Sequence, residues 1–536
     1  MDAMPATTHR GLWTVVRRRG LWIGVVVGLL VACVSWIVSS PIGGSPDEDY
    51  HLNSVWCPGP AGATCPIVGY HGTAPEIALP QVLVLSSTCL SKNGVIPEAC
   101  PRPLSPTALQ DTWRHNEGQY PGGYYYIMHI FTSNHFVRSV WTIRMANALL
   151  SFGLFAALLC LLPAASRRLL VYTAVATFVP LVFYIVTSVN PSAWGIMGVV
   201  TAWFGLQGAF VASSRGRRIA LGALAVFGTV LAALSRSDCA AMCAVAAASV
   251  IVLHWPTWSQ WRQWAHQARQ WRQAVWQVGA VAVVLVVAVV GFFSGAQHSA
   301  LSSQTATSQS PHNDTALELL WHNIQQLPSL LGQMWQASLG YPDFSVSALA
   351  GWLPMIAAFG LLFWGLRRCN WRKVLALVGV GAAMCALPLY MAQSLFSPLT
   401  TSGIQGRYMA PLVIVFFAIA MMRRDASGAG TLSWPQTVTA LLLVAAGNAL
   451  ALYTLMRRYI TGLNDFTINL DAHVQWWPSG VPSPMLVWVL GSLGFAAALL
   501  CLVAVRRAHD AIPREIGATP AQERLTPSTP SRALES

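Results

Sequence analysis

The sequence predicts an all-α polytopic membrane protein, and its composition is the first observation that does so. Of the 536 residues, 54% are hydrophobic and only 10% are charged, whereas about a quarter of the residues in ordinary soluble domains are charged. The second observation is a series of apolar stretches near the ~20 residues that a helix needs to cross ~30 Å of hydrocarbon. The third is the net charge of +13. It comes from arginines clustered between apolar stretches, where they orient spans, so we expect no nucleic-acid partner.

The apolar stretches predict about 12 transmembrane helices by this length criterion. When the N-terminus is placed in the cytoplasm, alternation of the spans puts six arginine clusters, from residues 167–168 to residues 506–507, on the cytoplasmic side. That distribution obeys the orientation rule for membrane proteins. We therefore expect a multi-pass protein of the plasma (inner) membrane with cytoplasmic N- and C-termini. The predicted spans are 21–39, 145–162, 169–189, 193–213, 219–234, 240–254, 275–294, 346–366, 374–392, 408–422, 438–456 and 485–505.

The segments between the spans complete the predicted organisation. Tryptophans at positions 261, 264 and 271 share one helical face, which predicts a helix lying in the inner membrane interface, in contact with lipid. The last segment is rich in Pro, Thr, Ser and Arg and has no apolar periodicity, so we expect disorder there. The predicted parts are a cytoplasmic N-terminus (1–20), the first transmembrane helix (21–39), an outer loop (40–136), a transmembrane bundle (137–295) with its interfacial helix (255–275), a second outer loop (296–345), a C-terminal bundle (346–507) and a disordered cytoplasmic tail (508–536).

The first outer loop contains four of the eleven cysteines, at Cys57, Cys65, Cys89 and Cys100. The other seven lie in or at the ends of apolar spans. Four cysteines in an exported loop indicate two disulfides, for which three connectivities exist. We favour the nearest neighbours, Cys57 with Cys65 and Cys89 with Cys100, over the alternative of free thiols. The sequence therefore predicts a large disulfide-bonded first outer loop.

An acidic motif follows the first span directly. Asp47, Glu48 and Asp49 are consecutive and precede His51, while Pro46 disfavours helix just before them. One carboxylate could act as a general base toward an acceptor hydroxyl, or bind a divalent cation such as Mg or Mn, while Asp49 or His51 orients it or joins the cation site. The alternative is a solvated acidic turn. Because the chain has only 19 acidic residues, we favour the functional interpretation.

Two arginines lie at the outer ends of spans, against the orientation rule. Arg144 begins the second span, and Arg407 follows Gln405 and Gly406 before a late one. A guanidinium beside a glycine, where no side chain obstructs approach, suits bidentate binding of the phosphate of a lipid-linked donor. Snorkelling of the arginine to the membrane surface is the alternative and weighs equally for Arg407.

Three further outer residues are candidates for contact with a sugar. Tyr124 and Tyr125 follow a turn signal at residues 119–123. The default interpretation is an aromatic belt at the membrane interface, and the more specific alternative is stacking against a sugar. Asn190 precedes a proline that makes a good helix start, which explains its position equally well. In the outer hairpin at residues 235–238, the arginine and the aspartate are placed to pair with each other.

Three short motifs, SPDEDYH at residues 45–51, NPS at residues 190–192 and QGRY at residues 405–408, together resemble the actinobacterial members of a predicted membrane protein family called domain of unknown function 2142 (DUF2142). The resemblance runs from the first span to the last. That family is similar to the GT-C class of glycosyltransferases, polytopic enzymes that use polyprenyl-phosphate-linked sugars outside the membrane. In GT-C enzymes the catalytic acid follows the first helix. The resemblance thus implies a GT-C-like fold, places that role on Asp47 or Glu48, and leaves metal dependence open.

The sequence supports one principal hypothesis, an inverting transfer of a sugar from a polyprenyl-phosphate donor to an envelope glycan, lipid or protein acceptor. Asp47 would be the base, Glu48 or His51 would orient it or help to bind a cation, and Arg407 with Arg144 would neutralise the leaving phosphate. No nucleotide-binding loop, dinucleotide fingerprint or metal-spaced Cys/His motif occurs, so no cofactor is certain. The alternatives are a transporter or flippase of a lipid-linked solute, and a non-catalytic envelope-assembly subunit that docks through the disulfide-bonded loop.

Overall fold

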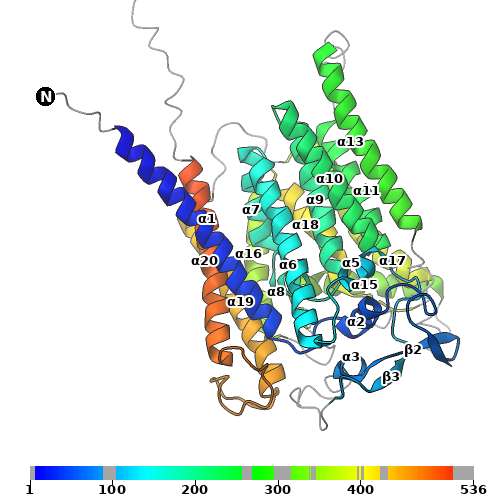
Figure 1. The fold of residues 1–536 in the computed structure, drawn as a ribbon. Coiled ribbons are helices and arrows are strands. Elements are labelled where there is room, and N and C mark those ends of the chain that lie inside the picture. Colours follow the sequence, from blue (N-terminus) through cyan, green and yellow to red (C-terminus); the bar gives the residue numbers. More distant parts are fainter. Residues whose placement is uncertain are drawn as a thin grey trace, which may run out of the picture.

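The fold is described from a computed structural model. It consists mostly of helices arranged as a bundle with a small sheet at one end (Figure 1). The structure describes residues 7–87, 104–255, 268–294, 315–336, 339, 346–367, 369–394, 397–399, 404–422 and 432–510. The helices are α1 (Thr7–Val38), α2 (Glu48–Trp56), α3 (Gln81–Val84), α5 (Gly123–His129), α6 (Phe136–Leu161), α7 (Ala164–Thr177), α8 (Pro180–Val186), α9 (Ser192–Val211), α10 (Arg215–Ser235), α11 (Ser237–His254), α13 (Ala268–Phe293), α15 (Ala316–Gln336), α16 (Ala348–Leu366), α17 (Trp371–Ser394), the 3-10 helix η1 (Gly406–Met409), α18 (Ala410–Met421), α19 (Trp434–Ile460) and α20 (Pro484–Asp510).

Ten helices within the described residues are long and apolar enough to cross a membrane. Each matches one of the predicted spans. The two remaining predicted spans are a bent pair of helices, α7 with α8, and a shorter apolar helix over Gly406–Met421. The prediction of a mostly helical polytopic membrane protein is therefore confirmed. The described residues contain ten candidate spans, or eleven if the bent pair counts as one, against about 12 predicted. The ten helices are α1, α6, α9, α10, α11, α13, α16, α17, α19 and α20.

The predicted span at residues 169–189 is not one continuous helix. α7 and α8 meet at a bend of 102°. Val179 is extended, with φ −71° and ψ 166°, and Pro180 begins α8. Proline has no N–H for the preceding helix and pushes the residue before it out of helical geometry, so the span breaks at this point.

The first and last described helices, α1 and α20, pack side by side, as the blue and red helices of Figure 1 show. α1 and α20 touch at Gly28 and Gly494. A Cβ added to Gly28 would lie 2.5 Å from the carbonyl oxygen of Gly494, and one added to Gly494 would lie 2.8 Å from that of Gly28. Small residues of this kind let the backbones of membrane helices approach closely. This contact packs the first span directly against the last.

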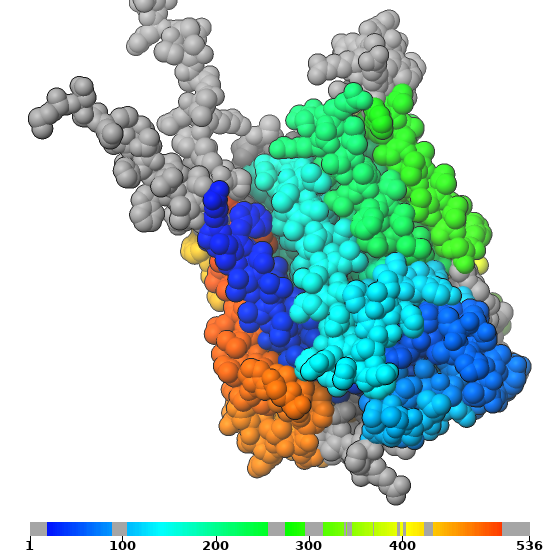
Figure 2. Space-filling model, viewed as in Figure 1, coloured from blue at the N-terminus to red at the C-terminus, as the bar shows by residue number. Residues whose placement is uncertain are grey.

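The first loop folds into a small layer at one end of the bundle. We call this end of the bundle the loop end. Three antiparallel strands, in the order β1-β2-β3, extend this layer beyond α2, α3 and α5. Ile77 on the central strand pairs with Ile67 on one side and with Thr112 on the other. The sheet departs from the all-helical expectation. Figure 2 shows the layer, in lighter blue than α1, at one end of the bundle. The strands are β1 (Ile67–His71), β2 (Ala74–Pro80) and β3 (Leu109–Thr112).

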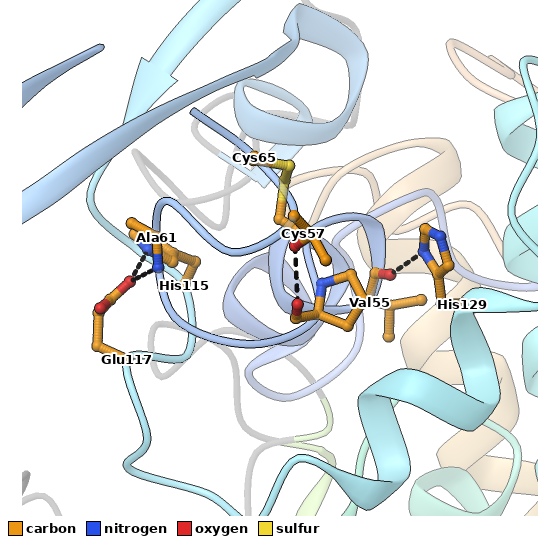
Figure 3. Close-up of a disulfide and its surroundings, with 9 residues drawn as sticks. Val55, Cys57, Ala61, Cys65, His115, Glu117 and His129 are labelled. Carbon is orange, nitrogen blue, oxygen red and sulfur yellow. Dashed lines mark hydrogen bonds and ion pairs between the residues drawn. A yellow bond between two sulfur atoms is a disulfide. The ribbon is translucent and has the colours of Figure 1, made fainter. Parts of the chain in front are cut away.

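A disulfide joins Cys57 to Cys65 and ties the end of α2 to the approach to β1 (Figure 3). Their Cα atoms are 5.8 Å apart. The predicted pair Cys57–Cys65 is thus confirmed. Cys89 and Cys100 lie outside the described residues. The seven other cysteines are free, which agrees with their predicted place in or beside the spans.

The second outer loop, the predicted interfacial helix and the tail are among the predicted segments that fall partly outside the described residues. Of the second outer loop, at residues 296–345, the structure describes mainly α15, which packs against η1 at the loop end. Of the predicted interfacial helix at residues 255–275, residues 256–267 lie outside the description, and from Ala268 onward the chain is already α13. The tail is not described beyond residue 510.

Candidate functional site

The acidic motif lies in a tight turn between α1 and α2. Asp47 caps α2 with φ 55°, a left-handed conformation that residues with a side chain seldom adopt. Two hydroxyls from the bundle bind the carbonyl of Gly44 just before it, Tyr459 at 2.5 Å and Tyr184 at 3.3 Å. Strained residues that neighbouring structure holds in place are concentrated at functional sites. Among the described residues, Asp47 shares this positive φ only with His473, outside glycine, and it is the one residue of the acidic motif that has it.

Glu48, the next residue, is buried in an ion pair with Arg144 of α6. The exposed fractions of the two side chains are 0% and 1%. Nε and Nη2 of Arg144 donate to the two carboxylate oxygens at 2.9 and 2.5 Å. The remaining N–H groups donate to the backbone carbonyls of Ile37, Ser40 and Pro41. All five N–H groups of the guanidinium are thus used within the protein. The structure leaves none for a donor phosphate, the role predicted for Arg144.

Glu48 also organises the residues around it. Its oxygens accept the N–H of Val189, at 3.2 Å, and of Ser45, at 3.4 Å. Asn190, beyond α8, donates its side-chain N–H to the carbonyl of Pro46 at 2.8 Å. Asn190 is 1% exposed, so it fixes the acidic turn and has no surface for the sugar contact predicted for it.

Asp47 pairs with Arg407 of η1, a residue 360 positions away in the chain. The Asp47 side chain is 36% exposed and that of Arg407 only 5%. The Nε of Arg407 is buried and has no hydrogen-bond partner among the described residues. Burial tends to raise the pKa of the Asp47 carboxyl, but the guanidinium of Arg407 and other nearby cations bring it below its ordinary value. Gln405 lies half-buried at the N-cap of η1.

Gly406 has a different role from the one predicted. The sequence suggested that its missing side chain leaves room for a ligand. Instead, a Cβ there would lie 2.0 Å from the carbonyl oxygen of Leu330 in α15. The Gly406 N–H also donates to Gln333 at 2.9 Å. The glycine therefore allows α15 to pack directly on the element that carries Arg407.

Arg236, in the hairpin between α10 and α11, lies close to Arg407 and Tyr408. Arg236 donates to both carboxylate oxygens of Asp238, at 2.9 and 2.7 Å, which confirms the predicted pairing. Its guanidinium carbon lies 4.4 Å from the ring centre of Tyr408 and 5.5 Å from that of Tyr120. Such stacking places a buried cation beside the ring of Tyr408, and the Arg407 guanidinium lies within 5.4 Å of the same ring.

The sequence interpretation missed Tyr408 and Tyr120 as part of the site. Tyr408 is the last residue of the QGRY motif, and Tyr120 lies in the turn at residues 119–123. The only local signal is that Tyr408 directly follows Arg407. Nothing local in the chain brings Tyr120 near Arg236.

The third ion pair of the acidic motif, between Asp49 and Arg114, lies nearer the surface. Nε and Nη2 of Arg114 both bind one oxygen of Asp49, at 2.9 and 2.7 Å. Arg114 is 45% exposed. Burial raises the pKa of Asp49, and the charge of Asp47 adds to this effect against the attraction of Arg114. The pKa values of Asp47 and Asp49 are therefore displaced in opposite directions.

The His51 ring packs against the rings of Tyr50, Tyr120 and Tyr125. Its Nδ1 lies 2.9 Å from the hydroxyl of Tyr125. Burial lowers the pKa of His51 to about 3, so the ring is neutral at physiological pH. No three His, Cys, Asp or Glu side chains converge to hold a metal within the described residues. The cation role predicted for Asp49 and His51 therefore has no set of ligands in that part of the chain.

Tyr124 and Tyr125 are core residues at the loop end. Both are completely buried. The Tyr124 hydroxyl accepts a hydrogen bond from Asn147 at 2.9 Å, while that of Tyr125 contacts His51. Neither ring has an exposed face on which a sugar could stack, in contrast to the prediction.

The comparisons with known proteins agree with this membrane architecture. A family model described as predicted membrane protein (DUF2142) matches residues 30–416, well over half of the chain. No curated protein and no solved structure matches the chain significantly. The matched range contains both Asp47 and Arg407. The chain therefore belongs to the DUF2142 family.

Proposed function

We propose that this DUF2142 protein transfers a glycosyl group from a polyprenyl-phosphate sugar to a hydroxyl of an envelope glycan, lipid or protein at the outer face of the plasma membrane. The observation that carries the proposal is the pairing of Asp47 with Arg407. It combines a partly exposed carboxylate, able to take a proton, with a buried guanidinium, able to neutralise a phosphate. Transfer from a sugar phosphate to a hydroxyl uses a base for the proton of the hydroxyl and a positive charge for the leaving phosphate.

The proposed reaction is a direct displacement at the anomeric carbon of the sugar. The acceptor oxygen forms a bond to that carbon as the bond to the phosphate oxygen breaks, and the bonding electrons leave with the phosphate. Asp47 takes the proton of the acceptor hydroxyl, and Arg407 stabilises the charge that develops on the leaving phosphate. A displacement of this kind inverts the configuration of the sugar.

The other residues of the motif support Asp47 without touching the substrates. Glu48 has no exposed surface and both of its oxygens bind Arg144, so we assign it a positioning role. Asp49 is held by Arg114 and His51 by Tyr125. The active carboxylate is therefore Asp47, the one of the three that retains substantial exposure.

Placement of this site on the outer face has support from the first loop. The loop end carries the disulfide Cys57–Cys65, and disulfides persist in oxidising compartments outside the cytoplasm. The distribution of arginine clusters predicts the same orientation. Lipid-linked sugars are consumed at such a face, next to the bilayer that holds their hydrocarbon chains.

The test compares the wild-type protein with Asp47→Asn in lipid nanodiscs supplied with labelled polyprenyl-phosphate sugars. The measured quantity is released polyprenyl phosphate. We expect loss of the base to slow release roughly 100- to 10,000-fold. Asp111→Asn, which removes an exposed carboxylate of β3, is the matched control and should release at the wild-type rate. Failure of the wild type to release the lipid from any donor, or full release by Asp47→Asn, would contradict the proposal.

The bend between α7 and α8 favours a second candidate, a transporter or flippase of a lipid-linked solute. Broken spans frequently form the binding sites of transporters. However, the groove beside this bend is lined by apolar side chains, including Phe152, Phe178 and Phe183, which offer no polar group to a solute. Movement of a labelled lipid-linked sugar across proteoliposomes, without release of polyprenyl phosphate, would favour this candidate over the enzyme.

A further inference from the structure

Arg144 and Arg236 are buried arginines at the loop end, and each binds both oxygens of one carboxylate. Nε and Nη2 of Arg144 bind the two oxygens of Glu48. The same two nitrogens of Arg236 bind the two oxygens of Asp238. This two-point arrangement is the preferred geometry between a planar guanidinium and an anion with two oxygens.

Arg407 lacks this arrangement. Only its Nη2 binds Asp47, while its Nε is buried and has no hydrogen-bond partner among the described residues. Arg407 is itself 95% buried, since its exposed fraction is 5%. A buried N–H without a partner is costly, and in native proteins it calls for an explanation. An anion with two oxygens would satisfy both nitrogens.

We propose that the Asp47–Arg407 pair is a latch opened by the donor phosphate. The phosphate takes Nε and Nη2 of Arg407, and the Asp47 carboxylate turns away to become free for the acceptor hydroxyl. The exchange replaces one anion by another, so the buried guanidinium is never left without a counter-charge. This inference rests on the proposed function, because it names the event that makes the base available.

The structure allows Asp47 to move and keeps Arg407 in place. The Asp47 side chain is 36% exposed, whereas its backbone carbonyl is held by the N–H groups of Tyr50 and His51. Arg407 belongs to η1, where Gly406 packs against the backbone of α15 at Leu330. Asp47 is therefore the partner whose side chain can turn away.

The exchange also makes Asp47 a stronger base at the right moment. While paired, its pKa is held below the ordinary value by Arg407. Once a phosphate neutralises Arg407, burial and the new negative charge act in the opposite direction and raise the pKa. The base would then be fully active only with the donor in place. The charged and titratable groups around Asp47 are Arg407, His51, Arg114, Asp49, Tyr50, Tyr120 and Tyr408.

The test is a binding measurement with two probes, inorganic phosphate and a short-chain polyprenyl phosphate, on purified protein in nanodiscs. If Asp47 competes with phosphate for Arg407, Asp47→Asn should bind the polyprenyl phosphate at least about tenfold more tightly than the wild type. Arg407→Gln should bind it at least about tenfold more weakly. Equal or weaker binding by Asp47→Asn overturns the latch.

Asp49→Asn is the matched control, because it removes the same charge two residues away and leaves Asp47 paired with Arg407. It should change the affinity by no more than about threefold, and a gain equal to that of Asp47→Asn would also overturn the proposal. If Asp47→Asn does not fold, Asp47→Gly replaces it, because glycine adopts the left-handed conformation of this position without strain.

The two probes separate the sources of the phosphate. Tighter binding of the polyprenyl phosphate alone supports a latch opened by a lipid headgroup. Equal gains for inorganic phosphate support a latch opened by the phosphate group itself. Because binding needs no turnover, the latch can hold while glycosyl transfer fails, and transfer can hold while the latch fails, so the two proposals are judged separately.

Discussion

Asp47 and Glu48 are neighbours in one turn, and each pairs with an arginine, yet the two pairs differ in nearly every physical respect. Glu48 is completely buried and meets Arg144 through two oxygens. Asp47 is 36% exposed and meets Arg407 through one. The first pair joins α6 to the acidic turn, while the second reaches across the fold to η1. The first pair is thus a saturated ion pair that holds the turn together, whereas the second leaves its carboxylate partly exposed.

The largest effect should come from breaking the saturated pair. Arg144→Met leaves Glu48 buried without a counter-charge, which we expect to cost about 3–5 kcal/mol of the free energy of unfolding. The measurement is the thermal unfolding of purified protein in detergent. The double substitution Arg144→Met with Glu48→Leu removes both charges and should regain much of the loss. A single variant as stable as the wild type would show that the pair is not structural.

The next effect concerns the support of the Asp47–Arg407 pair. Gly406→Ala places a Cβ against the backbone oxygen of Leu330, so η1 must move away from α15. We expect a loss of about 1–3 kcal/mol in stability, together with weakened phosphate binding at Arg407. Gly332→Ala, in α15 itself, adds a methyl where nothing lies within 4 Å and is the matched control. If both variants behave alike, the packing of α15 does not position Arg407.

A smaller effect should appear in the pH dependence of stability. The folded-state pKa of His51 is about 3, below its ordinary value of 6.5. Between these pH values the unfolded chain binds a proton that the folded chain refuses, so stability falls as the pH decreases, by up to ~1.4 kcal/mol per unit. Thermal unfolding followed from about pH 7 to about pH 4 should therefore show a shallower decline in His51→Gln. His71→Gln, at an exposed position of β1, should decline as the wild type does.

The smallest effect should come from the outermost ion pair. Arg114 is 45% exposed, so Arg114→Ala should cost less than about 1 kcal/mol in the free energy of unfolding. The same unfolding measurement, repeated at high salt, should reduce the difference further because salt screens exposed charges. A loss as large as that of Arg144→Met would remove the distinction between buried and exposed pairs on which the comparison depends.

Much of the fold follows from the sequence because its signals are local. Hydrophobic length predicts the spans, the spacing of cysteines predicts the pair Cys57–Cys65, and two residues in one hairpin predict the pairing of Arg236 with Asp238. Pro180 is a local signal for the break between α7 and α8, but a prediction from hydrophobic length alone does not use it. The acidic motif at the end of the first span was visible for the same reason.

The tertiary structure alone decided which member of that motif keeps the most exposed carboxylate. Asp47 and Glu48 are adjacent in the chain and both carry a carboxylate. Their arginine partners lie 360 and 96 residues away in the sequence. Long-range packing determines these partners. It also buries Tyr124 and Tyr125 and places Gly406 against α15. Local patterns report how a segment meets lipid or water. They carry no information on which distant side chain meets it, because that contact depends on how all the helices pack together.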